Sequence, residues 1–134
     1  MLRVKGWPEK YNASVCARIA GLAGGMFTRL GTPIRHLTAL LARQRTRLRL
    51  LFLLSDGKPH DEDGYDGVYG IEDTRQAVAE ARVQGITLFC LTVDRHGSSY
   101  LPQMFGPRGY AVLWEVTQLP QRLPDLYRRL TTAP

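Results

Sequence analysis

Two nearly continuous apolar runs, at residues 48–54 and 86–93, dominate the hydropathy pattern of the chain. Each run has the length of a strand, and apolar residues at nearly every position are typical of a parallel strand covered on both faces. The segment between them has helical periodicity, with an apolar stripe of Ala77, Val78 and Ala81, and Gly85 is placed to end that helix. The pattern predicts a strand–helix–strand unit and therefore an α/β fold.

The flanking segments extend this alternation. Residues 110–113 predict a short third strand, and the last segment predicts a helix that packs back onto the sheet, with Pro124 acceptable only near its start. Upstream, we expect a remnant strand at 2–5, a helix at 11–20, a Gly-rich turn at 23–28 and a helix at about 30–43. Asp73 and Gln76 have the spacing of a capping box, which would begin a helix near Asp73.

Length and composition indicate one soluble domain. The 134 residues are 44% hydrophobic and 22% charged, which are ordinary globular values. No apolar stretch approaches the roughly 20 residues of a membrane span, so we expect no membrane insertion. The start of the chain lacks the apolar core of a secretion signal, and Cys16 and Cys90 are more simply explained as thiols than as a disulfide. These features favour a cytoplasmic protein.

Charge is strongly segregated within a net charge of +6. Residues 1–54 carry ten Lys or Arg against the single Glu9, and four of these arginines lie at alternate positions from Arg43 to Arg49. The arginine cluster suits a helix carboxyl end, or a docking face for an acidic protein partner. It has no interleaved aromatic residues, so nucleic-acid binding is not expected.

An acidic segment follows, because residues 55–73 carry seven Asp or Glu against the single Lys58. Counted from Asp61 it resembles a calcium loop, but the sixth position, which should be glycine for the sharp turn, is Asp66. A solvated loop that meets a partner is the better interpretation.

The best candidate for a functional site is Ser55-Asp56-Gly57, directly after the first apolar run. Ligands of open α/β sheets bind beyond the carboxyl ends of their strands, and Asp94 has the equivalent place after the second run. Two interpretations of Asp56 stay open from these residues: a functional carboxylate, or an aspartate that only caps its turn.

Several motifs together carry a family resemblance that spans essentially the whole chain. The chain resembles the C-terminal von Willebrand factor A domain of the NorD/CbbO proteins through Thr28-Arg29-Leu30-Gly31, Ser55-Asp56-Gly57-Lys58-Pro59, Tyr69-Gly70-Ile71-Glu72-Asp73-Thr74-Arg75, Thr92-Val93-Asp94 and Tyr100-Leu101-Pro102, with Phe105-Gly106 and Gly109-Tyr110.

That resemblance implies a partial von Willebrand A, Rossmann-like three-layer fold with a mostly parallel sheet and helices on both faces. It implies that Thr28 and Asp56 are ligands of a magnesium ion, with Ser55, Gly57 and Asp94 on the surrounding partner-binding surface. The Asp-x-Ser-x-Ser loop of the family's metal site does not occur in this sequence. We therefore expect residues 1–134 to be a single domain that lacks the first strand, first helix and second strand, with weak magnesium binding or none.

The functional expectations follow from the same resemblance. Members are non-catalytic accessory proteins that act with a MoxR-type AAA+ ATPase on a target enzyme, which is nitric oxide reductase for NorD-like and rubisco for CbbO-like proteins. The alternative from another class is a metal-dependent phosphoryl-transfer enzyme that uses Asp56. An incomplete sheet would also expose a strand edge and favour self-association. We expect an incomplete piece of a longer accessory protein, with Met1 an internal start, rather than a reduced module.

Overall fold

One parallel sheet of three strands forms the centre of the protein, in a computed structural model that describes residues 2–25 and 28–132. The strands β1 (Leu50–Ser55), β2 (Thr87–Thr92) and β3 (Tyr110–Val112) lie side by side in the order of the sequence. β1 pairs with β2 along its full length, with Phe52 opposite Phe89, and β2 pairs with β3. The strands predicted at 48–54, 86–93 and 110–113 are confirmed, as is the α/β class.

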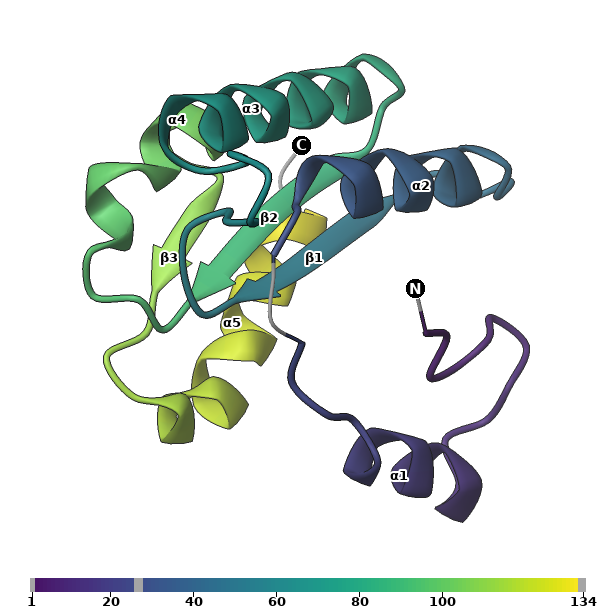
Figure 1. Cartoon of the computed structure of the whole chain (residues 1–134). Coiled ribbons are helices and arrows are strands. Elements are labelled where there is room, and N and C mark those ends of the chain that lie inside the picture. The colour runs from purple at the N-terminus through teal and green to yellow at the C-terminus, as the bar shows by residue number, and fades with distance from the viewer. Residues whose placement is uncertain (1, 26–27, 133–134) are drawn as a thin grey trace.

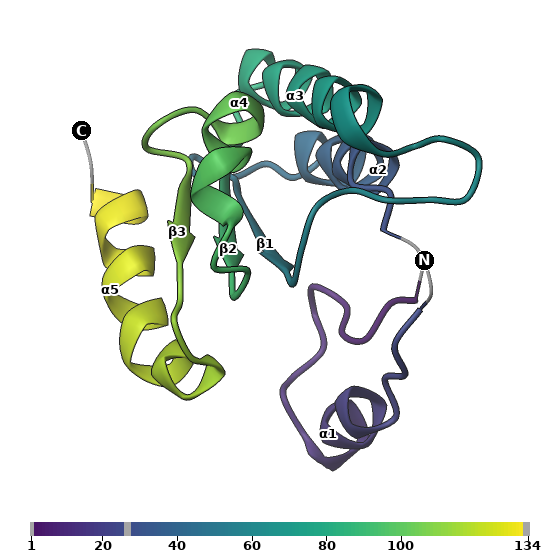
Figure 2. The ribbon, with the colours of Figure 1, turned by 60° about the vertical axis from the view of Figure 1, so that its left-hand side comes forward.

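Helices cover both faces of this sheet (Figures 1 and 2). The helices α2 (Gly31–Ala42), α3 (Gly67–Val83) and α4 (Leu101–Phe105) lie on one face, and α5 (Leu119–Thr132) lies on the other. Short 3₁₀ turns at Gly97–Ser99 (η1) and Val116–Gln118 (η2) precede α4 and α5. The helix α1 (Ala13–Ala20) stands apart from the sheet. The arrangement is that of a partial Rossmann-like fold.

The core lies between the sheet and the α2–α3 layer. Ala77, Val78 and Ala81 are buried there, as the predicted stripe requires, and Gly85 adopts a positive φ of 72° just beyond the helix end. Along β1, Leu51 belongs to this core. Because successive side chains of a strand point to opposite faces, Phe52 points instead toward α5.

The outer edge of β1 is open within residues 2–25 and 28–132, where no strand pairs with it on the side away from β2. A cavity of about 660 Å³ lies beside this edge, lined by Leu50 and Phe52 of the strand and by Leu123 and Tyr127 of α5. Leu54, near the end of the strand, is 62% exposed. The strand β1 is thus covered on one face of the sheet and only partly covered on the other.

The predictions for the amino-terminal part were less successful. The expected remnant strand at 2–5 is wrong, because residues 2–6 are irregular and pair with no strand in the described ranges. The first helix begins at Ala13 rather than at residue 11, because the Asn12 side chain accepts a hydrogen bond from the Val15 amide (3.1 Å) and caps the helix there. Met1 and residues 26–27 of the predicted Gly-rich turn lie outside the described residues.

Two helix starts also differ from expectation. The predicted start near Asp73 is wrong: α3 begins at Gly67, and Asp73 lies inside it, where its carboxylate makes tertiary contacts. Pro124 was expected only near a helix start, but it is the sixth residue of α5. Its missing N–H leaves the carbonyl of Pro120 without a helical partner, and Pro120 is exposed, so water can satisfy it.

Both cysteines are free thiols, Cys16 exposed and Cys90 buried, and burial raises the pKa of Cys90 to about 12. In the described ranges, no helix has the length and apolar character needed to cross a membrane.

Candidate functional site

The loops that carry the predicted site residues meet at the carboxyl edge of the sheet. Thr28, just before α2, forms an antiparallel bridge with His60 in the loop after β1: the Thr28 amide donates to the His60 carbonyl (2.8 Å) and the His60 amide to the Thr28 carbonyl (2.9 Å). The Val93 amide donates to the Ser55 carbonyl (3.4 Å), which joins the ends of β1 and β2. The structure thus connects the segments that sequence motifs singled out separately.

Asp56 is exposed at this edge, and its carboxylate has no hydrogen-bond or ion-pair partner among the described residues. The turn is held instead by Ser55, whose hydroxyl donates to the Gly57 carbonyl (2.9 Å) and accepts from the Gly57 amide (3.4 Å). Of the two interpretations left open by the sequence, the geometry argues against the one in which Asp56 only caps its turn. Ser55 stabilises the turn, and the Asp56 carboxylate is left available to a ligand.

Asp94 has the opposite character, because both of its carboxylate oxygens are used within the protein. One accepts from the His96 amide (2.9 Å) and the other from the Tyr100 hydroxyl (2.8 Å). These two bonds hold the pKa of Asp94 below its usual value. Asp94 therefore builds the turn after β2, and of the two strand-end aspartates only Asp56 offers uncommitted oxygens.

Tyr100 also connects this turn to the Asp56 loop. The Lys58 ammonium lies 5.2 Å from the centre of the Tyr100 ring, in the geometry of a cation–π contact. Burial and the bond to Asp94 together raise the pKa of Tyr100 above its ordinary range, so this hydroxyl stays a donor. The loop after β1 is thereby attached to the loop after β2 by a side chain as well as by the sheet.

A cavity of about 300 Å³ lies beside Asp56. Its walls are mainly apolar and come from the strand ends and the start of α5, including Leu54, Leu91, Leu113 and Leu119. A carboxylate at the rim of an apolar hollow suits contact with a partner side chain or a bound cation.

The donor types at this edge fit magnesium, because the Asp56 carboxylate and the Thr28 hydroxyl are hard oxygen ligands. Their number is small. No cluster of three or more His, Cys, Asp or Glu with metal-binding geometry occurs in residues 2–25 and 28–132. Magnesium commonly keeps several waters and binds through one or two carboxylates, so Asp56 and Thr28 would form one part of its coordination shell, with waters or a partner oxygen in the rest.

Ion pairs hold the acidic segment against the start of α2. Arg29, next to Thr28, pairs with both Asp61 and Asp63, and its guanidinium lies 5.0 Å from the centre of the Tyr65 ring. The contact with Arg29 holds the pKa of Asp61 below its usual value. The acidic segment is therefore fixed near Thr28 through part of its charge, which the sequence-based description as a solvated loop did not anticipate.

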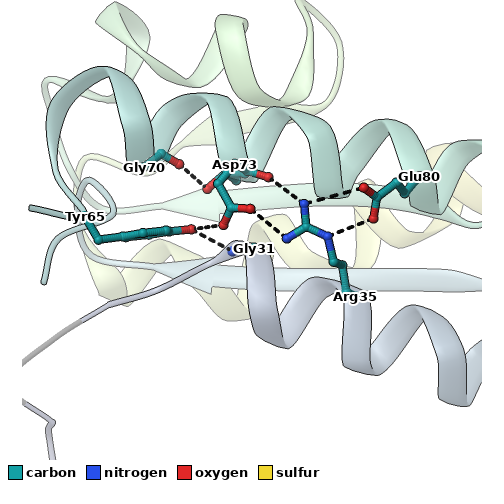
Figure 3. Close-up of polar contacts among 7 residues, drawn as sticks. Gly31, Arg35, Tyr65, Gly70, Asp73 and Glu80 are labelled. Atoms are coloured by element: carbon teal, nitrogen blue, oxygen red, sulfur yellow. Dashed lines mark hydrogen bonds and ion pairs between the residues drawn. The ribbon is translucent and has the colours of Figure 1, made fainter. Parts of the chain in front are cut away.

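A polar network extends this attachment into the α2–α3 interface (Figure 3). The Tyr65 hydroxyl donates to the Asp73 carboxylate and accepts from the Gly31 amide (3.3 Å). Arg35 of α2 donates to Asp73 (2.7 Å) and to Glu80 (2.8 Å) of α3. Partial burial of Asp73 opposes its ionisation, but the bonds from Tyr65 and Arg35 outweigh burial and lower its pKa.

Sequence reasoning missed this network, because its members are far apart in the chain and Asp73 also fitted a capping box. One signal was present in the motif around Gly70. A Cβ at Gly70 would lie 3.0 Å from the Cβ of Pro59, so the helix and the loop after β1 approach closely at that point. Thr74 donates to the Gly70 carbonyl (2.7 Å) from a fully buried position. The residue types of this motif are therefore explained by close packing between α3 and the loop after β1.

Comparison with known proteins gives a consistent set of relatives. The chain is 50% identical over 127 residues, 95% of its length, to an uncharacterized protein of Pseudomonas aeruginosa, covering 21% of that protein. It is 47% identical over 127 residues to Protein NorD of Brucella melitensis, covering 20% of it. It is 48% identical over 118 residues, 88% of its length, to Protein NorD of Stutzerimonas stutzeri, covering 19% of it.

The chain thus spans about one fifth of the length of the curated relatives it matches. No protein-family model matches it, and no solved structure matches it. The sequence resemblance pointed to two kinds of protein, NorD-like and CbbO-like, and the similarity to proteins named NorD supports the first.

Proposed function

We propose that this chain is a NorD-like accessory module that acts, together with a MoxR-type AAA+ ATPase, in the activation of nitric oxide reductase. The main support is the 46–48% identity to proteins named NorD over 88–95% of the chain. The proposal concerns a module, because the matched proteins are about five times longer. The von Willebrand A assignment and a cytoplasmic location are parts of the same proposal.

The working surface of the module is the carboxyl edge of the sheet around Asp56. Asp56 contributes an exposed carboxylate without an internal partner, and Thr28 contributes a hydroxyl from a loop tied to the same region through His60. Asp56 and Thr28 would hold a magnesium ion at this edge together with waters, and part of its shell would be left to an oxygen of the partner. The ion would supply electrostatic attraction between the module and an acidic group of its partner, and no covalent bond would be broken.

Two alternatives are less well supported. A role with rubisco would fit a CbbO-like protein, but the relatives that carry a functional name are named NorD. A phosphoryl-transfer enzyme using Asp56 would need a second group close to the carboxylate, such as a general base or further metal ligands. The neighbouring Asp94 is committed to His96 and Tyr100, which makes Asp56 a poor centre for such chemistry.

The proposal is tested by affinity capture of the purified MoxR-type ATPase on the immobilised chain, with magnesium and with a chelator. We expect magnesium-dependent capture that Asp56→Ala removes and that Thr28→Ala weakens. Asp66→Ala is the matched control, because Asp66 is also exposed and its side chain makes no cap bond. Capture that survives Asp56→Ala unchanged would rule out this surface.

Calorimetric titration with magnesium and a phosphatase assay separate the remaining interpretations. Weak magnesium binding by the chain alone, strengthened by the ATPase, supports a shared metal site. Metal-dependent hydrolysis of a phosphate ester that Asp56→Ala abolishes would favour the enzyme instead. Thermal unfolding of each variant verifies that the fold is retained, which we expect because the Asp56 side chain faces solvent.

A further inference from the structure

A groove runs between α5 and the β2–β3 side of the sheet, away from the open edge of β1. It consists of three adjoining cavities of about 590, 370 and 170 Å³. Arg108 and Leu130 line both the first and the second cavity, and Arg129 and Leu126 line both the second and the third. Because the three cavities share walls in series, they make one elongated surface, which suits an extended segment better than a compact ligand.

Arginines are spaced along this groove. Arg108, Arg122 and Arg129 are exposed, and none of them has an acidic partner among the described residues. The one acidic residue on its walls, Asp125, is 3.8 Å from Arg128 on the same helix. An array of unpaired guanidiniums attracts carboxylates and other anions, and arginine binds carboxylates bidentately.

The floor of the groove is apolar. Phe89 is buried beneath it, and Tyr110, Leu126 and Leu130 are half-buried along it. None of the residues of α5 is fully buried, although the helix places its leucines on the side toward the sheet. The helix therefore packs loosely on the sheet, and apolar surface next to the arginines is left for another chain.

From this combination we propose that the groove docks an acidic polypeptide segment that carries apolar side chains. Glutamates or aspartates of the segment pair with Arg108, Arg122 and Arg129, and its leucine-type side chains enter the cavities against Leu126 and Leu130. Nucleic acid fits less well, because Phe89 is only 5% exposed and Tyr110 is half-buried, so neither presents an open ring face for stacking bases. Asp56 lines none of the three cavities, although Leu113 lines both the third cavity and the cavity beside Asp56, and docking in the groove does not depend on the proposed metal site.

The test measures binding of a fluorescent peptide of repeating Glu-Glu-Leu-Leu units by anisotropy at low and at physiological salt. We expect saturable, salt-sensitive binding whose Kd rises about tenfold when Arg108, Arg122 and Arg129 are all changed to glutamine. The control variant carries Arg3→Gln, Arg75→Gln and Arg95→Gln, which removes the same three charges from exposed positions that line none of the three cavities. Its Kd should stay within about twofold of the unmodified chain, because only local charges act strongly.

A second pair of variants tests the apolar part. Leu126→Ala should weaken binding of the peptide. Leu123→Ala should not, because Leu123 lies on the α5 surface that lines the cavity beside β1. An equal loss of peptide affinity in both arginine variants would show that binding depends only on net charge, and would overturn the docking site. So would tighter binding of oligothymidylate than of the peptide, equal binding of polyglutamate without leucine, or no saturable binding. Unfolding midpoints verify that each variant is folded.

Discussion

The hydroxyl of Tyr65 links the Asp73 carboxylate to the first amide of α2, by donating to Asp73 and accepting from Gly31. The residue before α2 is Leu30, which makes no side-chain cap bond. A helix start leaves its first amides without partners, so the tyrosine supplies from the acidic loop a bond that a local serine or aspartate would ordinarily provide. One side chain thus ties the loop after β1 to both α2 and α3.

The first prediction is that Tyr65→Phe destabilises the protein by about 1–3 kcal/mol, because it leaves the buried Gly31 amide and one Asp73 oxygen without this partner. Chemical denaturation measures the change. Tyr69→Phe is the matched control, since Tyr69 is 65% exposed and contacts only the edge of the Tyr65 ring. A surface change of this kind stays within about 0.5 kcal/mol. Equal effects of the two substitutions would contradict the cap.

The second prediction separates the role of Asp73 in the interface from the capping role that its sequence position suggested. Asp73→Ala removes the acceptor of Tyr65 and Arg35 and should cost about 1–3 kcal/mol. Asp66→Ala, at the actual start of α3, should cost less than about 0.5 kcal/mol, because the Asp66 side chain makes no cap bond. The midpoints of denaturant-induced unfolding measure both changes in stability. A larger loss of stability in Asp66→Ala than in Asp73→Ala would indicate that the Asp66 side chain caps α3 in the conventional way.

The third prediction concerns acid stability. Because the folded pKa of Asp73 lies below the reference value of 3.8, its contribution to folding is fully present above that value and is lost as pH falls through the lower folded pKa. The unmodified chain should therefore lose stability between about pH 5 and pH 2 more steeply than Asp73→Asn, which cannot titrate there. Unfolding midpoints across this range measure the slopes, and parallel profiles would show that Asp73 does not contribute.

The fourth prediction uses the close approach of α2 to the same carboxylate. A Cβ at Gly31 would overlap Asp73, so Gly31→Ala must displace the carboxylate from Tyr65 and Arg35, at a cost of about 1–3 kcal/mol. Gly57→Ala is the control, because a Cβ at Gly57 meets nothing within 4 Å. Thermal and chemical unfolding of the pair should differ clearly, and a Gly31→Ala protein as stable as Gly57→Ala would refute the tight contact.

How far the sequence predicts the structure depends on whether the signal is local. The runs around Leu51 and Leu91 predicted strands because burial on both faces requires continuous apolar sequence, and Gly85 predicted a helix end because its conformation favours glycine. Asp73 was misassigned because a local pattern competed with a tertiary one: its partners Arg35 and Tyr65 come from other elements, and pairing across such separations leaves no periodicity in the sequence.

At the candidate site, the strand ends were predictable but the roles of the side chains were not. Ser55, Asp56 and Asp94 all follow apolar runs, yet the structure commits Ser55 to Gly57 and Asp94 to Tyr100, and leaves Asp56 uncommitted. These differences depend on turn geometry and on a tyrosine six residues away. Sequence position placed these candidate residues at the strand ends, and the hydrogen bonds show that Asp56, unlike Asp94, has no internal partner among the described residues.

The last prediction is that the chain self-associates through the outer edge of β1. Among residues 2–25 and 28–132 no strand pairs with this edge, which leaves backbone donors and acceptors beside an apolar sequence, and such edges recruit further strands. A charge placed on an edge strand opposes this pairing, so Leu54→Lys should shift the chain toward the monomer. Leu54 is 62% exposed, so the substitution removes little core packing.

The control is Val83→Lys, which adds the same charge at the end of α3. The Val83 side chain is 89% exposed and distant in sequence from β1, so this substitution should leave association unchanged. Sedimentation velocity over a range of concentrations measures the effect. A chain that stays monomeric at every concentration, or that responds equally to both substitutions, would show that its association does not use the β1 edge.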